Sequence, residues 1–228
     1  MDLKIKDVAE LINVSETTVR RWLGSGKIPA YRLNGQYRFS RTEIEDWVMR
    51  QKLSATEEES LEEKTEEAPS GNMHFSLFRA IYRGGVLTLP PHLSKEEIIR
   101  AGMAHMSKSY DLDAEVLTDL FLDREKLMST GLNHGIGVPH TRDFLLNTHF
   151  DVVLVVYPGQ PVDWGSLDGE PVHTLFFLFA SEDKSHLHLL SKVAHLSSGE
   201  KTRAFLRTQP SKERLLDFVK HWESSLSH

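Results

Sequence analysis

The sequence of 228 residues contains no cysteine, so disulfide bonds and metal sites built on thiolates are excluded. It has no apolar run of about 18 residues, the minimum for a membrane-spanning helix. Its first residues, Met1-Asp2-Leu3-Lys4, do not have the pattern of a signal peptide. We therefore expect a cytoplasmic protein. The length leaves room for one large or two small domains, and 39% of hydrophobic residues is enough for their cores.

The sequence also lacks a large net charge, but its formal charge of −6 is unevenly distributed. Residues 1–50 hold nine Lys/Arg and seven Asp/Glu, residues 51–72 hold two and seven, and the remainder holds sixteen and nineteen. This distribution predicts a slightly basic head (residues 1–50), an acidic linker (51–72) and a mildly acidic body (73–228). The linker has few large apolar residues, and we expect it to be flexible.

The head has the pattern of a small winged helix-turn-helix domain. Helices are expected over residues 5–12, 16–23 and 41–50, where apolar residues recur at helical spacing. Ser15 is a favourable N-cap for the second of them. Asn34-Gly35 lies between two short alternating segments and indicates a β-hairpin. This architecture is typical of DNA-binding proteins.

The order of motifs in the head, among them Val14-Ser15 and Gly26-Lys27, resembles the excisionase/MerR-like family. The resemblance implies that the second helix enters the major groove of duplex DNA. Arg32 and Arg38 are expected to share one face of the hairpin and to reach phosphate or the minor groove. The candidate DNA-binding residues are Thr17, Thr18, Arg20, Arg21, Arg32 and Arg38. The alternative is a small protein-binding helical domain with solvated arginines.

The body has the pattern of an α/β domain, a layered mixed sheet flanked by helices. Two continuous apolar runs, Val152–Tyr157 and Val172–Ala180, predict strands that are buried on both faces. Ser94 and Glu97 form a capping box and Asp113 is a second N-cap, so helices are expected to begin after both. The last third of the body has helical periodicity.

Three glycines within seven residues precede a Pro-His pair, and this segment is the main candidate for a functional site. It contains Gly131, Gly135, Gly137, Pro139, His140 and Arg142, with Arg124 shortly before it. A rigidly presented neutral imidazole is a nucleophile, while glycine amides and arginines hold oxyanions, as a phosphohistidine site requires. The alternative is a Gly/Pro-rich turn with a surface histidine, which composition alone favours. As a loop residue, His140 is expected to carry little packing.

Five short motifs follow one another in the body. They are Arg124–Lys126, Ser129–Gly131, Gly135–His140, Gly169–His173 and Ser185–Leu190. In order and spacing they resemble the IIA proteins of the bacterial sugar phosphotransferase system, in the fructose, mannitol and nitrogen-regulatory branch, over roughly residues 73–225. The resemblance implies that His140 is phosphorylated, that His186 is its active-site companion, and that HPr or its nitrogen-branch relative is the donor. No cofactor is implied, since the phosphoryl group comes from phosphoenolpyruvate through enzyme I and HPr.

The twelve histidines suggest a metal site as another interpretation. Such a site would group His134, His140, His186 and His188. In a helix His186 and His188 lie about 200° apart and cannot face one site, and we expect His188 on the solvent side. No carboxylate is expected near these histidines, so we predict no metal. His173 lies in an apolar segment and is expected to be a core residue.

These features together predict a regulator in which a DNA-binding head is tethered to a phosphoryl-accepting body. Such a protein is a phosphotransferase component and not a stand-alone turnover enzyme. A homodimer is compatible with the sequence. Two alternatives stay open: a regulator whose body only docks protein partners, and a IIA component that serves a separate sugar permease.

Overall fold

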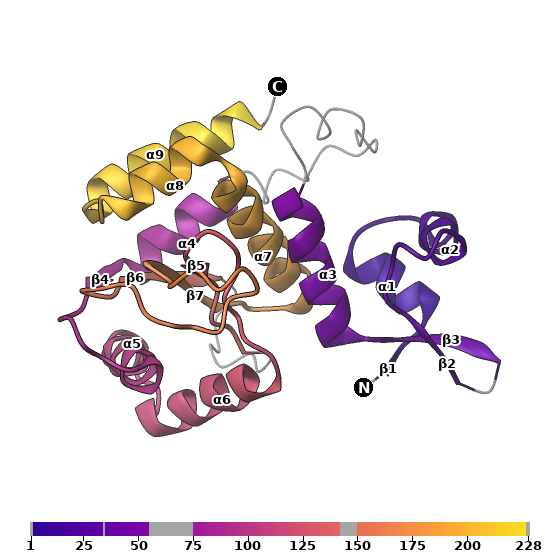
Figure 1. Ribbon diagram of the computed structural model, residues 1–228, viewed down its shortest axis with the longest axis horizontal. Helices are drawn as coiled ribbons and strands as arrows, with labels where there is room; N and C mark the ends of the chain where they lie inside the picture. The colour runs from indigo at the N-terminus through magenta and orange to yellow at the C-terminus, as the bar shows by residue number, and fades with distance from the viewer. Residues whose placement is uncertain (1, 34, 55–74, 142–149, 227–228) are drawn as a thin grey trace.

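The computed structural model describes residues 2–33, 35–54, 75–141 and 150–226 (Figure 1). The first of its two lobes contains three helices and three short strands. In chain order these are β1 (Asp2–Leu3), α1 (Ile5–Leu11), α2 (Glu16–Gly24), β2 (Tyr31–Leu33), β3 (Gln36–Ser40) and α3 (Arg41–Ser54). The strands form a sheet in the order β1-β3-β2, and the helices pack on it through Val8, Val19 and Ile44. The predicted helix-turn-helix with its hairpin is confirmed; Asn34 itself lies outside the described residues.

The second lobe is a four-stranded mixed sheet between two layers of helices. Its elements are α4 (Ser76–Gly84), β4 (Val86–Thr88), α5 (Lys95–Tyr110), α6 (Ala114–Leu127), β5 (Ile136–Gly137), β6 (Val152–Tyr157), β7 (Thr174–Phe179), α7 (Asp183–Ser198), α8 (Glu200–Arg207) and α9 (Lys212–Ser225). The strand order is β4-β6-β7-β5, in which β6 and β7 are antiparallel and the two edge strands run parallel to their neighbours. The α/β class predicted for the body is confirmed.

The two central strands are apolar on both faces because each face packs against a different helical layer. Alternate residues of β6, such as Val153 and Val155, face α4, α7 and α9. The intervening residues, such as Leu154 and Val156, face α5 and α6. All residues of both strands are buried, as continuous apolar runs predict.

The predicted helix starts are confirmed by their capping bonds. Ser15 Oγ accepts from the backbone N–H of Thr18 at the start of α2. Ser94 and Glu97 form the reciprocal capping box of α5, and Asp113 accepts from two backbone amides at the start of α6. Side-chain acceptors of this kind satisfy N–H groups that have no partner within the helix.

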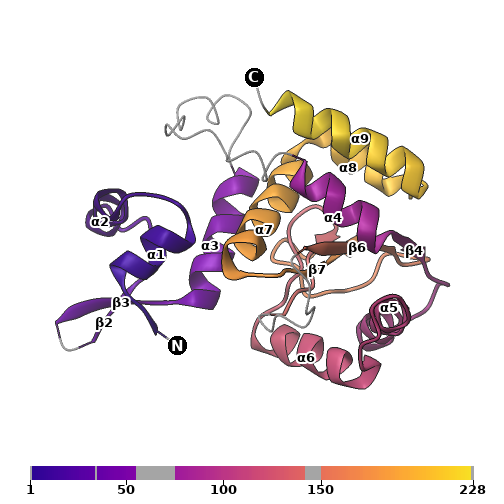
Figure 2. The same cartoon turned by 180° about the vertical axis from the view of Figure 1, so that it is seen from behind.

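The two lobes are joined by α3, which lies along α7 in both views (Figures 1 and 2). Met49 of α3 packs in the hydrophobic core of the body, and Leu187 of α7 packs in that of the head. Both side chains are buried. The helix predicted to end at Arg50 continues to Ser54, and most of the predicted linker, from residue 55 onward, lies outside the described residues.

The prediction that the His188 side of α7 faces solvent is wrong. His188 is half-buried, and its Nε2 lies 2.9 Å from Ser76 Oγ of α4. Lys192, on the same side, pairs with the buried Glu223 of α9, and His195 contacts Trp222. The helix therefore packs on all sides, because α4 and α9 cover a face whose sequence is polar. Among the described helices, none is long and apolar enough to cross a membrane.

Candidate active site

His140 lies three residues after the end of the edge strand β5 and continues the path of that strand along β7. Its backbone forms a parallel bridge with Leu178 of β7, and the Leu178 N–H donates to the carbonyl of Pro139 at 2.9 Å. The side chain is only 1% exposed. The expectation of a lightly packed loop histidine is therefore wrong, because the segment after β5 is held as part of the sheet edge.

One nitrogen of the His140 ring is fixed by the backbone. Nδ1 lies 2.7 Å from the carbonyl oxygen of Val138, and a carbonyl can only accept, so Nδ1 carries the proton. In the neutral ring the other nitrogen, Nε2, then holds the lone pair. A neutral imidazole with a defined tautomer is the form required of a nitrogen nucleophile.

His186, in the first turn of α7, lies against His140. The two ring centroids are 5.1 Å apart and the rings are nearly perpendicular, at 76°. His186 is 4% exposed, whereas His188 points toward α4 on another side of the helix. The structure thus brings together the two histidines that helical phase and family resemblance paired.

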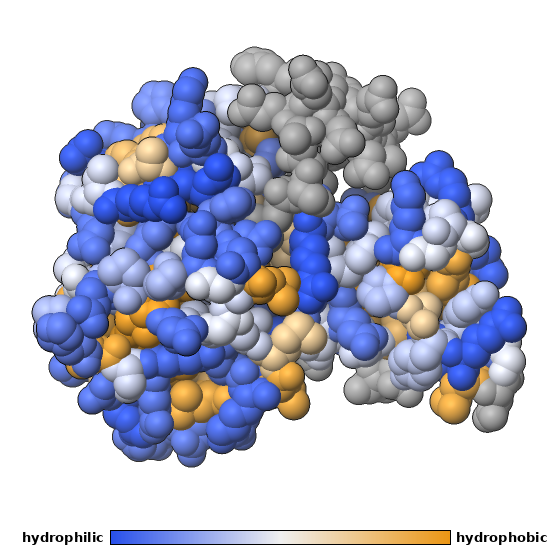
Figure 3. All heavy atoms as spheres, viewed as in Figure 1, coloured by the Kyte–Doolittle hydropathy of each residue, from blue (hydrophilic) through white to orange (hydrophobic). Residues whose placement is uncertain are grey.

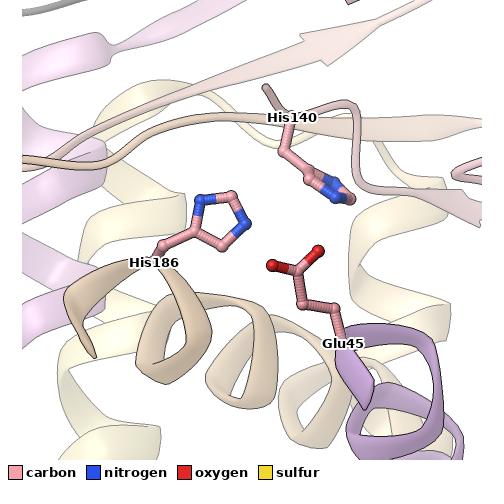
Figure 4. Close-up of side chains that lie close together, drawn as sticks. All are labelled: Glu45, His140 and His186. Carbon is pink, nitrogen blue, oxygen red and sulfur yellow. The ribbon is translucent and has the colours of Figure 1, made fainter. Parts of the chain in front are cut away.

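A third residue of this site, Glu45, comes from the head. Figure 4 shows its carboxylate rising from α3 toward both imidazoles. The oxygen of Glu45 and the ring nitrogens of His140 and His186 lie within 4.8 Å of one another, and Glu45 is 3% exposed. The expectation that no carboxylate lies near these histidines is therefore wrong. Sequence reasoning missed Glu45 because the docking of α3 on α7 depends on tertiary packing and has no local signal.

Glu45, His140 and His186 could in principle act as ligands of a metal ion. Tetrahedral zinc has bonds of about 2.0–2.2 Å, which places its ligand atoms roughly 3.4 Å apart. The ligand atoms of the three residues lie within 4.8 Å of one another, so the set offers one oxygen and two nitrogens at most to such an ion. A second set, His134, Asp168 and Glu170, is more exposed, and the two Asp168 oxygens accept from the backbone N–H groups of His134 and Glu170.

Arg124 lies at the C-terminal end of α6 and is buried beneath α3. Its Nη1 donates to the carbonyl of Met128 at 2.9 Å, and its Nη2 lies 3.8 Å from Asp46 Oδ1 of α3. The neighbouring Glu125 accepts from the backbone N–H and the hydroxyl of Thr130 and pairs with Lys95 at 2.6 Å. These bonds fix the base of the turn that leads to His140. Arg142 lies outside the described residues.

The three glycines have packing roles within this turn. Gly131 and Gly137 face each other in an antiparallel bridge. Gly135 has φ +74°, and a Cβ there would lie 2.6 Å from Cδ2 of His173. The amide of Gly131 donates to Ser129 Oγ, so this N–H is used within the turn. A role of the glycines in holding phosphoryl oxygens stays a prediction.

His173 is a buried neighbour of the turn, as expected of a core residue. Its Nδ1 lies 2.9 Å from Thr174 Oγ1, and its backbone N–H donates to the carbonyl of Gly135. Burial lowers the pKa of His173, and the positive charge of Arg207 lowers it further. The ring is therefore held in its neutral form.

Helix α2, which carries four of the candidate DNA-binding residues, lies on the side of the head away from the body (Figure 2). Thr17, Arg20 and Arg21 are exposed, and Arg20 Nη2 lies 3.6 Å from Glu16 Oε2. Thr18 is half-buried, and its hydroxyl lies 2.9 Å from Ser15 Oγ in the N-terminal cap.

The prediction that Arg32 and Arg38 share one face of the hairpin is wrong. Arg32 is paired across the strands with Tyr37, and Arg38 with Tyr31, so consecutive pairs point to opposite faces. Arg32 stacks on the ring of Tyr37 at 4.8 Å, whereas Arg38 donates to Gln36 Oε1 at 2.8 Å. Because Leu33 pairs with Gln36, Arg32 and Arg38 belong to adjacent pairs of the ladder and not to the same or alternate pairs, which would share a face.

The fold and the paired histidines define a IIA-type phosphocarrier domain joined to a helix-turn-helix domain. A family model described as "Phosphoenolpyruvate-dependent sugar phosphotransferase system, EIIA 2" matches residues 85–222, and a helix-turn-helix domain model matches residues 3–52. Since the first match spans more than half of the chain, the chain belongs to the EIIA 2 family, the phosphocarrier components of the phosphoenolpyruvate-dependent phosphotransferase system.

Its relatives include nitrogen regulatory proteins. That of Pseudomonas aeruginosa is 36% identical over 111 residues, which are 48% of this chain and 71% of the relative. That of Escherichia coli is 32% identical over 121 residues, which are 52% of this chain and 74% of the relative. The crystal structure of nitrogen regulatory protein IIA-Ntr from Neisseria meningitidis is similar with a TM-score of 0.54 and 26% identity, over 59% of this chain and 92% of that one. The predicted family resemblance is confirmed.

Proposed function

We propose that the body accepts a phosphoryl group on His140 from HPr or an NPr-type phosphocarrier and that the head binds duplex DNA. The observation that carries this proposal is the buried pair of His140 and His186, in which the Val138 carbonyl fixes the tautomer of the first ring. Membership of the EIIA 2 family and the helix-turn-helix match support it.

In the proposed transfer, the lone pair of His140 Nε2 attacks the phosphorus of the donor's phosphohistidine in line with the breaking bond. The donor N–P bond breaks, and its electron pair returns to the donor imidazole. His186 would donate a hydrogen bond to a phosphoryl oxygen and so fix the geometry of transfer. Arg124 and Arg142, with the amides of the glycine turn, would stabilise the charge on the oxygens.

The proposed role in DNA binding rests on exposed polar residues of α2 and on the hairpin. Thr17, Thr18, Arg20 and Arg21 would face the major groove, and Arg32 and Arg38 would contact phosphate on either side of the hairpin. With a net charge of +2, the head makes few phosphate contacts, so we expect weak and salt-dependent binding. Dimerisation of the body would strengthen it by raising the effective concentration of a second head.

Incubation with phosphoenolpyruvate, enzyme I and HPr tests the phosphoryl transfer. Intact mass should show one added phosphoryl group, which should be labile in acid and stable in base. His140→Ala should not be labelled, while circular dichroism should show that it folds. Labelling of this variant would overturn the assignment of His140.

A second candidate function is a DNA-binding regulator whose body docks partners without being phosphorylated. The burial of His140 under α3 favours it, since a buried imidazole is not accessible to a donor protein. The third candidate, a IIA component of a separate permease, would require onward transfer. Absence of labelling would favour the docking function, and transfer from labelled protein to a IIB domain would favour the permease component.

A further inference from the structure

Two consecutive acidic residues of α3 face the groups that the proposed function assigns to phosphoryl binding. Glu45 points toward His140 and His186, and Asp46 Oδ1 lies 3.8 Å from Nη2 of Arg124. The side chains of Asp46 and Arg124 are 11% and 4% exposed, so this pair is largely withdrawn from water. A helix of the DNA-binding domain thus presents carboxylates to the histidines and the arginine of the phosphocarrier domain.

An ion pair between the first turns of α3 and α7 extends the contact between the head and the body. Arg41, at the start of α3, lies 2.7 Å from Asp183 Oδ2, at the start of α7. Its Nε also lies 3.5 Å from Glu45 Oε1. Arg41 therefore connects the first turn of α7 with the carboxylate that enters the site.

With α3 in this position, a donor protein cannot approach His140. In-line transfer requires the reacting atoms to come within about 3–3.5 Å of each other, and the donor is itself a histidine on a folded protein. His140 is 1% exposed, and the space beside its ring is occupied by Glu45. Transfer from another protein thus requires α3 to leave.

The contact between α3 and the body is not packed along its whole length. An open cleft of about 630 Å³ lies between α3 and the turn before His140, lined by Asp46, Met49 and Arg50 on the helix and by residues 128–133 of the body. In the space-filling view the two lobes are also separated by a notch (Figure 3). Beside the packed Met49 and Leu187, the contact includes two ion pairs, Arg41–Asp183 and Asp46–Arg124.

We propose that the surface around His140 is a docking surface for α3, and that α3 and the phosphocarrier compete for it. This inference rests on the proposed function. A phosphoryl group adds roughly two negative charges at a position that faces the Glu45 carboxylate. Like charges that are shielded from water repel more strongly than exposed ones, so phosphorylated His140 disfavours the docked helix. Phosphorylation of His140 thus releases α3 from the body, and docking of α3 prevents phosphorylation of His140.

Cross-linking α3 to α7 tests this competition in the full chain. Because the sequence contains no cysteine, Arg41→Cys with Asp183→Cys supplies the only two thiols, and a short bismaleimide joins them. The matched control is the same variant treated with N-ethylmaleimide, which adds similar bulk without a tether. Both are incubated with phosphoenolpyruvate, enzyme I and HPr and followed by intact mass.

We expect the cross-linked protein to be phosphorylated at less than about one-tenth of the rate of the control, since the rate follows the fraction of open molecules. Equal rates would overturn the competition and leave the proposed function standing. A wild-type chain that is never labelled would instead contradict the proposed function.

A second variant removes the two negative charges of α3 and keeps the shape of the side chains. Glu45→Gln with Asp46→Asn weakens the contacts to the histidines and to Arg124, so phosphorylation should be roughly tenfold faster than in wild type. Glu43→Gln is the control, since Glu43 is exposed on the same helix. A double variant no faster than this control would count against the proposal.

Discussion

Asp46 of α3 and Arg124 of α6 form a buried ion pair between the head and the body, with Oδ1 and Nη2 3.8 Å apart. Arg124 belongs to the motif that precedes His140. In the proposed function its positive charge stabilises the phosphoryl oxygens. In the structure that charge is opposed by a carboxylate of the helix-turn-helix domain. When α3 leaves the body, Arg124 loses the carboxylate that balances its charge. The pair therefore favours the state in which α3 is packed on the body.

His186 and His188 are two residues apart but differ in what they contact. His186→Ala should slow phosphoryl transfer by at least roughly tenfold, because the group that orients the reacting oxygens is lost. His188→Ala should transfer normally but lose about 0.5–1.5 kcal/mol of stability, because its bond to Ser76 is removed. Rates by intact mass and chemical denaturation check both. Equal transfer rates in the two variants would contradict the assignment.

Arg21 lies exposed on α2, whereas Arg38 is tied to Gln36. Arg21→Ala should weaken binding to duplex DNA and reduce the slope of log K against log salt by about one, as expected when one phosphate contact is lost. Arg38→Ala should also weaken binding. Fluorescence anisotropy at several salt concentrations measures both. Unchanged binding in both variants would indicate that the head docks protein instead.

His173 makes the stability of the body depend on pH. Its pKa is lowered in the folded state, first by burial and then by Arg207, so the unfolded chain binds the proton more readily. The stabilisation is complete above about pH 6.5, the ordinary pKa of histidine. It is lost as the pH falls toward the lower pKa that His173 has in the folded protein. The advantage of wild type over His173→Gln in free energy of unfolding should therefore shrink between pH 7.5 and pH 5.5. A difference independent of pH would refute this.

Glu223 is the buried carboxylate that ties α9 to α4. It accepts from the backbone N–H groups of Leu77 and Phe78 at 3.1 and 2.9 Å and pairs with Lys192. Glu223→Ala should cost about 3–5 kcal/mol of stability, because two helix-terminal amides and a buried ammonium lose their partner. Lys220→Ala, exposed on the same helix, should change stability by less than about 0.5 kcal/mol. Denaturation curves of the two variants, compared with wild type, measure both.

The sequence by itself determined the elements and their order. Side-chain caps such as Ser15 and Asp113 act within one turn of the chain, so they can be recognised without a structure. The apolar runs that became β6 and β7 specify strands buried on both faces. Helical phase separated His186 from His188, and together with the family resemblance it paired His186 with His140.

Only the tertiary structure decided what surrounds these elements. The polar side of α7 reads as a solvent face, yet α4 and α9 cover it, because Ser76 and Glu223 supply partners for His188 and Lys192. Glu45 has no local feature that marks it as part of a site. Its position follows from the packing of α3 on α7, which depends on Met49 and Leu187 and on contacts between residues far apart in the sequence. Periodicity and capping describe neighbours along the chain, whereas long-range packing brought a carboxylate of the head to the histidines of the body.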